Sequence, residues 1–388
     1  MNPTHHRPSR VIPVLSGAAV LCLLTMDYAV FQANRIVAGD GQSLWLALGY
    51  PWAGALVISL LGLMVLSRLP SLSLRWSYAI VMVLLMQMPL SLSWFGHFII
   101  PTDQPFARSA PAAGFWLLLF FALLLALELQ HRLQAGRLST WSMGLLVMSA
   151  WWLCVQLGWL DSLALVREYR SQSGPFAQAL HTHLLLVIGA VGASALLSAL
   201  LTAVVLNYTR TQNAIFAVLN FFQTIPSLAL FGLLIAPLSA LSAQFPWLQA
   251  LGIRGIGWAP AMIALIAYSL LPMVRNTTVA LQEVSASVLE SARGMGMSRA
   301  QIFLQVRLPL ALPVIIEGLR ITTIQAIGLT AVAALIGAGG FGTFIFQGLG
   351  QAAMDLVLLG ALPTIALAML ADVLLTTLAR FTSKGQPT

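Results

Sequence analysis

The sequence predicts an all-α, polytopic membrane protein with about ten transmembrane helices. Of its 388 residues, 59% are hydrophobic and 8% are charged, and the mean hydropathy is +0.90. Soluble domains carry about 25% charged residues. Eleven acidic residues cannot cover a soluble protein of this size, whereas a bilayer solvates apolar side chains and requires spans of about 20 apolar residues. A soluble globular protein is therefore excluded.

Apolar windows of about 20 residues recur along the chain, and each is long enough to cross a bilayer as a helix. The ten predicted spans cover residues 11–31, 45–66, 78–99, 113–130, 141–160, 182–206, 214–238, 258–279, 309–336 and 354–379. Short polar connections with turn residues, such as Gly39 and Gly41, separate them. Basic residues precede the first window, as in a signal peptide, but Asp27 and Tyr28 interrupt the region of the cleavage site, so we expect an uncleaved anchor.

The basic residues predict the orientation of the chain. If the N-terminus is cytoplasmic, 13 of the 19 Lys and Arg residues fall in cytoplasmic segments, five fall in outward loops, and Arg320 lies within a span. The positive-inside rule therefore places both termini in the cytoplasm. Only one of the 19 cations is lysine and no basic run is present, so the net charge of +8 reflects topology and not nucleic-acid binding.

The two halves of the chain differ in character. Residues 1–165 hold about five predicted helices joined by short loops, with tryptophans at several helix ends, and are typical of a scaffold. Residues 166–180 form a mixed-charge outward linker. In residues 181–388, the longest polar stretch between spans lies at about 281–308, on the predicted cytoplasmic side. We expect the function to depend on this stretch.

A spaced motif occupies this polar stretch. Residues 281–313 read LQEVSASVLESARGMGMSRAQIFLQVRLPLALP and reproduce the pattern E-A-A-x3-G-x9-I-x-L-P, with Ser replacing the second motif residue and Val replacing Ile. The residues that carry the pattern are Glu290, Ser291, Ala292, Gly296, Val306, Leu308 and Pro309. In this pattern the chain resembles the permeases of ABC importers, whose core has the type I, MetI-like fold.

The motif also makes physical sense as two short helices. Gly296 tolerates the positive φ of a tight turn, and Ser298 is suited to cap the second helix. Ser291 and Ala292 allow close packing, and Glu290 supplies a surface charge. The resemblance implies a coupling helix near 284–308 that docks on a separate ATP-binding cassette ATPase. An ordinary amphipathic loop is the simpler alternative.

Three further blocks are similar to permeases for glycine betaine, choline and related osmoprotectants. They are residues 181–210, FFQTIPSLALFGLLIAPL at 221–238 and IGAGGFGTFIFQGLG at 336–350. In the second block, polar side chains next to a proline within a span indicate backbone groups that face a translocation path. The candidate residues are Gln223, Thr224, Pro226 and Ser227. A proline kink satisfied by a neighbouring helix explains each residue equally well.

Other candidate sites receive simpler interpretations. A phosphate loop needs Gly-Lys-Ser/Thr, but the sole lysine, Lys384, precedes Gly385 at the tail, so we expect the Gly337–Gly342 cluster to serve close packing or an outer gate. His181 and His183 lack neighbouring acidic residues or cysteines, so we expect no metal site and no cofactor. The spacing of Glu317 and Arg320 favours an ion pair, with substrate contact by Glu317 as the alternative. Asp372 is expected near the membrane interface.

The resemblance implies a permease subunit of an ATP-driven, binding-protein-dependent osmoprotectant importer in the bacterial inner membrane. Its implied partners are an ATP-binding cassette ATPase, a periplasmic or extracellular solute-binding protein, a second permease subunit as homodimer or heterodimer, and membrane lipid. Aromatic cages for quaternary ammonium groups are expected on the binding protein. The alternatives are an importer for another small solute such as an amino acid, or a stand-alone secondary carrier that uses intramembrane carboxylates. No catalytic residues are expected.

Overall fold

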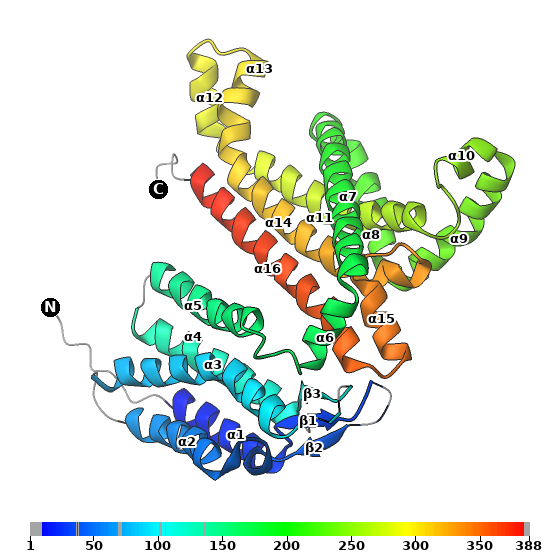
Figure 1. Cartoon of the computed structure of the whole chain (residues 1–388). Helices are drawn as coiled ribbons and strands as arrows, with labels where there is room; N and C mark the ends of the chain where they lie inside the picture. The colour runs from blue at the N-terminus through cyan, green and yellow to red at the C-terminus, as the bar shows by residue number, and fades with distance from the viewer. Residues whose placement is uncertain are drawn as a thin grey trace. The chain divides into compact units, whose positions relative to one another are not determined.

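The computed structural model describes residues 10–35, 37, 39–68, 72–100, 103–104, 106–134 and 137–383. Lys384, which entered the Walker A argument and the orientation prediction, lies outside these residues. The chain divides into two compact units, residues 1–171 and 172–388 (Figure 1). Each unit has its own packed helices and is described separately.

The N-terminal unit combines helices with a small sheet. Its elements are α1 (Val11–Thr25), β1 (Ala29–Gln32), β2 (Asp40–Gln42), α2 (Leu44–Leu66), α3 (Leu72–Phe98), β3 (Arg108–Pro111), α4 (Ala113–Arg132), α5 (Arg137–Gln156) and α6 (Ala164–Ser171). The strands form an antiparallel sheet in the order β2-β1-β3. The sequence analysis did not predict this sheet, because strands of three or four residues carry too few positions to show alternation.

The core of the N-terminal unit lies between α1, α2, α3 and α4. The largest fully buried side chains include Tyr28, Phe95 and Phe115, and the Tyr28 and Phe115 rings meet edge to face with centroids 5.7 Å apart. The Tyr28 hydroxyl shares a 2.6 Å hydrogen bond with Ser91 of α3. This bond satisfies a buried polar group and joins the start of the sheet to the helices.

The C-terminal unit consists of helices. Its elements are α7 (Ser173–Asn207), α8 (Thr209–Thr224), α9 (Ser227–Gln244), α10 (Pro246–Ala250), α11 (Trp258–Gln282), α12 (Ala286–Gly294), α13 (Arg299–Gln301), the π-helix η1 (Ile302–Arg307), α14 (Leu308–Ala333), the 3-10 helix η2 (Ala334–Ile336), α15 (Gly342–Gly350) and α16 (Met354–Ser383). Helix α11 packs against α7 and α14, and α14 packs against α16. Figure 1 shows α12 and α13 projecting beyond one end of α14.

Eight helices in the described part of the chain are long and apolar enough to cross a membrane, and two shorter apolar helices, Val11–Thr25 and Ser142–Gln156, accompany them. Nine of these ten segments coincide with predicted windows, and the remaining one, Ser227–Gln244, covers only part of the window 214–238. That window is not one span: it is divided between α8 and α9 by a break at Ile225 and Pro226.

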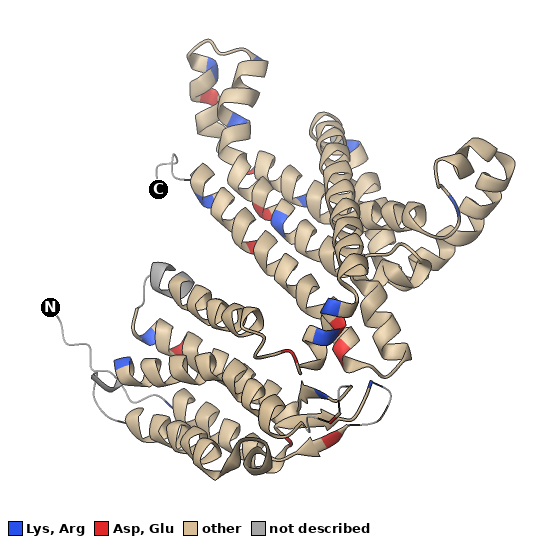
Figure 2. Cartoon of the chain, viewed as in Figure 1, with Lys and Arg blue, Asp and Glu red and all other residues tan. Residues whose placement is uncertain are grey.

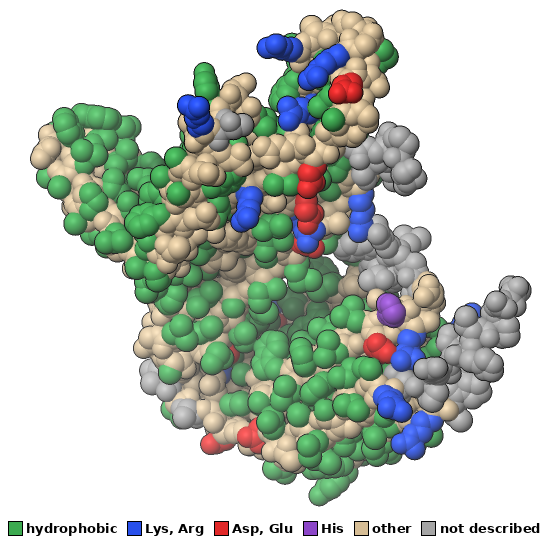
Figure 3. All heavy atoms as spheres, turned by 180° about the vertical axis from the view of Figure 1, so that it is seen from behind, with side chains coloured by type: hydrophobic (Ala, Val, Ile, Leu, Met, Phe, Trp, Pro, Cys, Tyr) green, Lys and Arg blue, Asp and Glu red, His purple; other side chains and the backbone are tan. Residues whose placement is uncertain are grey.

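Apolar and charged side chains occupy different parts of the surface. Hydrophobic side chains cover much of the helical surface (Figure 3), as expected where lipid replaces water. Charged residues gather at α12 and α13 and at a few points along the long helices (Figure 2). The end of the C-terminal unit that carries α12 and α13 is therefore polar, and its long helices are apolar.

The glycine cluster after α14 serves close packing, which was one of its two expected roles. Gly337, Gly339 and Gly340 all have positive φ values, of 77°, 84° and 80°. A Cβ on Gly342 would lie 1.8 Å from the carbonyl oxygen of Ala331, so only glycine fits there. His183 is fully buried beside this cluster, and its Nδ1 accepts a 3.4 Å hydrogen bond from the Phe341 amide.

Candidate functional site

The predicted motif forms a helical hairpin, made of α12, a turn and α13, which we call the α12–α13 hairpin (residues 285–301). Helix α12 ends in a Schellman motif: the Met297 amide donates to the Ala292 carbonyl at 3.2 Å, and the Gly296 amide donates to the Arg293 carbonyl at 2.9 Å. Gly296 has a φ of 80°, the left-handed value that this motif requires. The predicted turn at Gly296 is confirmed.

The second helix of the hairpin is capped as predicted. The Ser298 hydroxyl accepts from the Gln301 amide at 3.3 Å, and the Gln301 side chain accepts from the Ser298 amide at 2.8 Å, which completes a capping box. The chain then passes through η1, where wider π-type turns precede Pro309. Because proline has no amide hydrogen, it cannot donate the hydrogen bond that would continue the α-helical pattern into this segment. The π-helix was not predicted.

One side chain ties the hairpin to the long helices. Arg307, at the end of η1, donates from Nε to the carbonyl of Leu281 near the end of α11 at 2.7 Å. This charge-assisted bond satisfies a carbonyl in the last turn of α11. Because α12 also packs against η1, the hairpin and the ends of α11 and α14 are connected through one short segment.

The motif residues divide between the surface and the packed side of the hairpin. Ala292 is 2% exposed, so the small side chain serves close packing as expected. Those that face outward are Glu290, Ser291, Gly296 and Pro309, whereas Val306 and Leu308 are half-buried. Met295 is 74% exposed beside them. The hairpin thus presents a carboxylate and an adaptable apolar side chain on a rigid support.

The second predicted motif block forms the break between α8 and α9. Gln223 donates from Nε2 to the carbonyl of Tyr268 on α11 at 2.9 Å, and the Tyr268 hydroxyl donates to the carbonyl of Ile225 in the break. Thr224 donates to the Phe221 carbonyl within its own helix. Thr224 and Pro226 are exposed, and Ser227 is half-buried. A neighbouring helix therefore satisfies part of the freed backbone, and Tyr268, which the sequence analysis missed, is the residue that does so.

A cavity of about 320 Å³ lies along α8 and α11. Its polar lining includes Gln212, Asn220, Arg275 and Gln282. The sequence analysis did not predict it, because its residues come from two segments about 60 positions apart in the chain. It combines one guanidinium with several amides, which suits an anionic or zwitterionic group.

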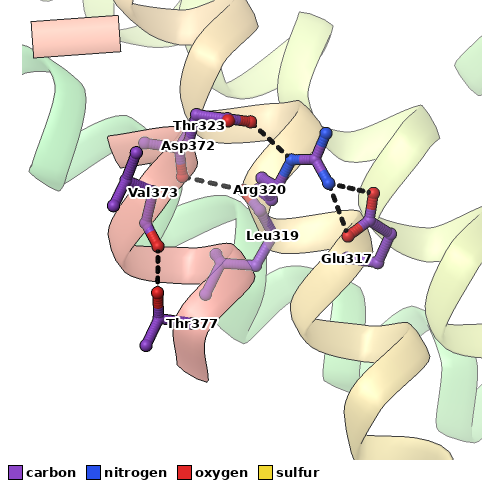
Figure 4. A network of polar contacts seen from close by, with 7 residues as sticks. All are labelled: Glu317, Leu319, Arg320, Thr323, Asp372, Val373 and Thr377. Atoms are coloured by element: carbon purple, nitrogen blue, oxygen red, sulfur yellow. Dashed lines mark hydrogen bonds and ion pairs between the residues drawn. The ribbon is translucent and has the colours of Figure 1, made fainter. Parts of the chain in front are cut away.

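Charged residues on α14 and α16 form a three-residue cluster (Figure 4). Arg320 Nη1 donates to both carboxylate oxygens of Glu317, at 2.7 and 3.0 Å, which confirms the predicted pair. Arg320 Nε lies 2.7 Å from Asp372 Oδ1, so Asp372 has a specific partner that the sequence analysis did not assign. The side chains are between 30% and 45% exposed. Glu317 is thus part of an ion cluster and is not joined to the break at Pro226.

Metal chemistry has no support in these residues. Among the described parts of the chain, no group of three or more His, Cys, Asp or Glu side chains is placed to hold a metal ion. Cys22 and Cys154 are both free.

A bundle of membrane-length helices that carries a rigid polar hairpin at one end defines a polytopic membrane protein with a structured element outside its apolar helices. Residues 182–384 match the family described as the binding-protein-dependent transport system inner membrane component. This match spans more than half of the chain, and the chain belongs to that family. It is a permease subunit of the ABC importer class and not an enzyme, since ATP hydrolysis in this class belongs to a separate ATPase.

Relatives with curated functions agree with this family. A glycine betaine/carnitine/choline transport system permease protein, OpuCD of Bacillus subtilis, is 34% identical over 57% of this chain and 90% of its own length. The osmoprotectant import permease protein OsmW of Salmonella typhimurium is 37% identical over 52% of this chain and 89% of its own. These names confirm the resemblance drawn from the motif blocks.

Two other matches complete the comparison. Residues 7–166 match a family described as the N-terminal domain of the ABC transporter permease YehY, a region in which the sequence analysis found no motif. Among solved structures, a chain of the methionine ABC transporter MetNI in an inward-facing conformation matches with a TM-score of 0.46 and 21% identity, over 54% of this chain and 96% of that chain.

Proposed function

We propose that this chain is the membrane-spanning permease of an ATP-driven, binding-protein-dependent importer whose cargo is an osmoprotectant of the glycine betaine and quaternary ammonium class. The observation that carries the proposal is the exposed hairpin at Gly296, within a region similar to osmoprotectant permeases over about nine-tenths of a relative's length. Another small solute, such as an amino acid, is the nearest rival cargo, and competition for uptake separates the two.

The hairpin is proposed as the contact with the ATPase. A docking element must be rigid in order to pass movement onward, and the Schellman motif, the capping box and the Arg307 bond supply that rigidity. It must also present recognisable chemistry, which Glu290 and Met295 offer at the surface. Closure of the ATPase on nucleotide would then move the hairpin and, through Arg307, the ends of α11 and α14.

The translocation path is proposed along the break in the second block. Gln223, Thr224, Pro226 and Ser227 mark the break between α8 and α9, and the cavity lined by Arg275 lies along α8 and α11. Arg275 suits the carboxylate of a zwitterionic cargo. Glu317 is proposed only as a secondary contact, because Arg320 already neutralises it.

The partners and orientation follow from the same proposal. Both termini and the α12–α13 hairpin are placed in the cytoplasm, and an external solute-binding protein delivers cargo from the opposite side. Charges that remain exposed to lipid are costly, so the half-exposed cluster at Arg320 supports a second permease subunit, identical or homologous, or a water-lined path on that side.

The deciding experiment is co-purification of the chain from mild detergent, followed by identification and assay of any ATPase that accompanies it. Glu290→Lys reverses the charge on the hairpin, and Asp40→Lys reverses an exposed acidic residue of the N-terminal unit as the matched control. We expect the ATPase to stay with the native chain and with Asp40→Lys, and to be lost from Glu290→Lys. Retention by all three chains would refute the hairpin as the docking site. Absence from all three would favour a stand-alone carrier.

A further inference from the structure

A second cavity, of about 570 Å³, lies wholly within the N-terminal unit, in a region for which the proposed transport cycle gives no role. Its lining is unusually aromatic. The side chains used below are Trp52, Trp94, Phe98, Trp159 and Asp161. They come from α2, from the end of α3 and from the turn between α5 and α6.

The aromatic rings form a connected wall. Trp52 and Trp94 meet edge to face with centroids 5.5 Å apart and an interplanar angle of 64°. Trp94 and Phe98 lie closer, with centroids 3.9 Å apart. Trp159 approaches from the other segment and is 50% exposed. The rings therefore border one common space, whereas a belt of interfacial tryptophans places each ring separately at the bilayer surface.

Close contacts fix the two sides of the cavity relative to each other. A Cβ on Gly96 of α3 would lie 2.0 Å from Ser162 Oγ, so glycine allows α3 to approach the turn. The Ser109 amide of β3 donates to the Ser162 carbonyl at 2.9 Å, and Gly158 adopts a φ of 75° to start the turn. The cavity is thus formed in advance of any ligand.

One carboxylate lines the cavity and is itself paired with an arginine outside the lining. Asp161 lines it, with a side chain that is 48% exposed and an Oδ1 atom 2.7 Å from Arg170 Nη2. Arg167 donates from Nε to the Asp161 carbonyl at 3.0 Å. The hydrogen bond with Asp161 raises the pKa of the Arg170 guanidinium. Asp161 thus brings a carboxylate to the cavity lining, and the two arginines, which do not line the cavity, hold that residue in position.

We infer that this cavity binds a trimethylammonium group, held by the tryptophan faces and by Asp161. A quaternary ammonium has no N–H donors, so ring quadrupoles and a carboxylate are the groups that can hold it. The choice of trimethylammonium over other organic cations that aromatic rings can hold rests on the proposed osmoprotectant cargo. The N-terminal helices would then carry a cargo-binding site of their own, separate from the path along α8 and α11.

The group can belong to a free solute or to a choline lipid headgroup, and the test separates the two. The full chain is placed in nanodiscs of phosphatidylglycerol, and binding of radiolabelled choline is measured with glycine betaine and the neutral isostere 3,3-dimethyl-1-butanol as competitors. We expect glycine betaine to compete and the isostere, which has the same shape without charge, to be at least about tenfold weaker. In parallel, the chain is purified from nanodiscs of mixed lipids, and the phosphatidylcholine that stays bound to it is quantified by mass spectrometry.

Variants assign the binding to this cavity. Trp159→Ala removes one wall and is expected to weaken choline binding about fivefold, because the ring is half-exposed and a cation–π contact there is weaker than a desolvated one. Trp76→Ala, on an α3 residue that is 64% exposed and does not line the cavity, is the matched control and should stay within twofold of the native value. Asp161→Asn keeps the shape of the side chain and removes its negative charge. A loss of choline binding in this variant therefore cannot be explained by misfolding of a Trp variant.

Each outcome decides the inference. Choline binding that falls in Trp159→Ala and in Asp161→Asn supports a solute site, and retention of phosphatidylcholine with the same variant pattern supports a headgroup site. Equal potency of the neutral isostere, or no dependence on either variant in both arms, overturns the inference. Uptake of glycine betaine is also measured in cells that produce the complete transporter. If the native transporter takes up glycine betaine but the cavity binds no choline, only the inferred site is overturned. If the native transporter takes up no glycine betaine, the proposed function is overturned.

Discussion

The α12–α13 hairpin is built from contacts within one continuous stretch, whereas the tryptophan-lined cavity of the N-terminal unit is built from three stretches far apart in the chain. In the hairpin, the turn at Gly296 and the cap at Ser298 are satisfied by neighbours within five positions. In the cavity, Gly96 of α3 faces Ser162 across more than 60 positions. Local bonding makes the first geometry robust to changes elsewhere, and the second depends on the packing of the whole unit.

The largest expected effect tests whether the hairpin is truly independent of distant contacts. Arg307→Met removes the one side-chain bond from η1 to Leu281, and a hydrogen bond to a charged group contributes about 1.5–3 kcal/mol. We expect uptake of glycine betaine to fall about tenfold or more, with normal amounts of the chain in the membrane. Arg299→Met, an exposed arginine on the hairpin, should retain most of the uptake. Equal activity of the two variants would contradict a coupling role for Arg307.

The matching test for the cavity is Gly96→Ala. The added methyl group overlaps Ser162 Oγ, so the turn must shift, and overpacking of this kind costs about 1–3 kcal/mol. We expect a lower unfolding temperature and weaker choline binding, measured by scanning calorimetry and by the radioligand assay. Ser162→Ala in the same chain removes the clashing oxygen and should restore part of both values. If Gly96→Ala alone behaves as the native chain, the close approach of α3 and the turn is not required.

A smaller effect is expected for Gly296→Ala. Alanine in the left-handed conformation costs about 1–2 kcal/mol, although nothing lies within 4 Å of the added Cβ. Co-purified ATPase should decrease several-fold while the global unfolding temperature changes little, because the strain is confined to the hairpin. Gly294→Ala, at a helical position with open space around it, is the control and should leave the yield of ATPase unchanged or raised. A large drop in global stability would show that the hairpin is not locally built.

The smallest effect is expected for Ser298→Ala, which removes the cap of the second hairpin helix. Loss of a serine cap costs about 1 kcal/mol, so hydrogen exchange at residues 299–302 should accelerate roughly fivefold, as measured by mass spectrometry. Ser287→Ala on α12, which caps no helix end, serves as the comparison. Exchange that is unchanged at residues 299–302 would mean that the box with Gln301 adds nothing to the hairpin.

The same division explains what the sequence could predict. The turn at Gly296, the cap at Ser298 and the pair of Glu317 with Arg320 depend on spacing within one segment, and all three were predicted. The clamp of Tyr268 on the break, the third charge of the cluster at Asp372, and the aromatic cavity depend on which helices become neighbours. Hydropathy places helices in a bilayer but does not state which faces meet, so these features required the structure.

Hydropathy also misjudged the region at Pro226. A continuous apolar window predicted one span, but proline and the polar residues around it end α8 and start α9. The average over about 20 residues hides a break of two residues. The N-terminal strands were missed for a related reason. Their three or four residues are too few to show an alternation of apolar and polar positions.

The π-type turns of η1 hold one residue more than α-helical turns would hold in the same stretch. A residue in an α-helix turns the chain by about 100°, and wider turns rotate each residue by less, so the six residues of Ile302–Arg307 cover roughly the angle of five α-helical residues. Deleting a single residue from Ile302–Arg307 with a return to α-helical spacing would therefore leave the exposed Glu290 side at about the same angle around the axis of α14. The segment thus holds one spare residue, and a one-residue change in chain length is absorbed there without turning the docking surface around the axis.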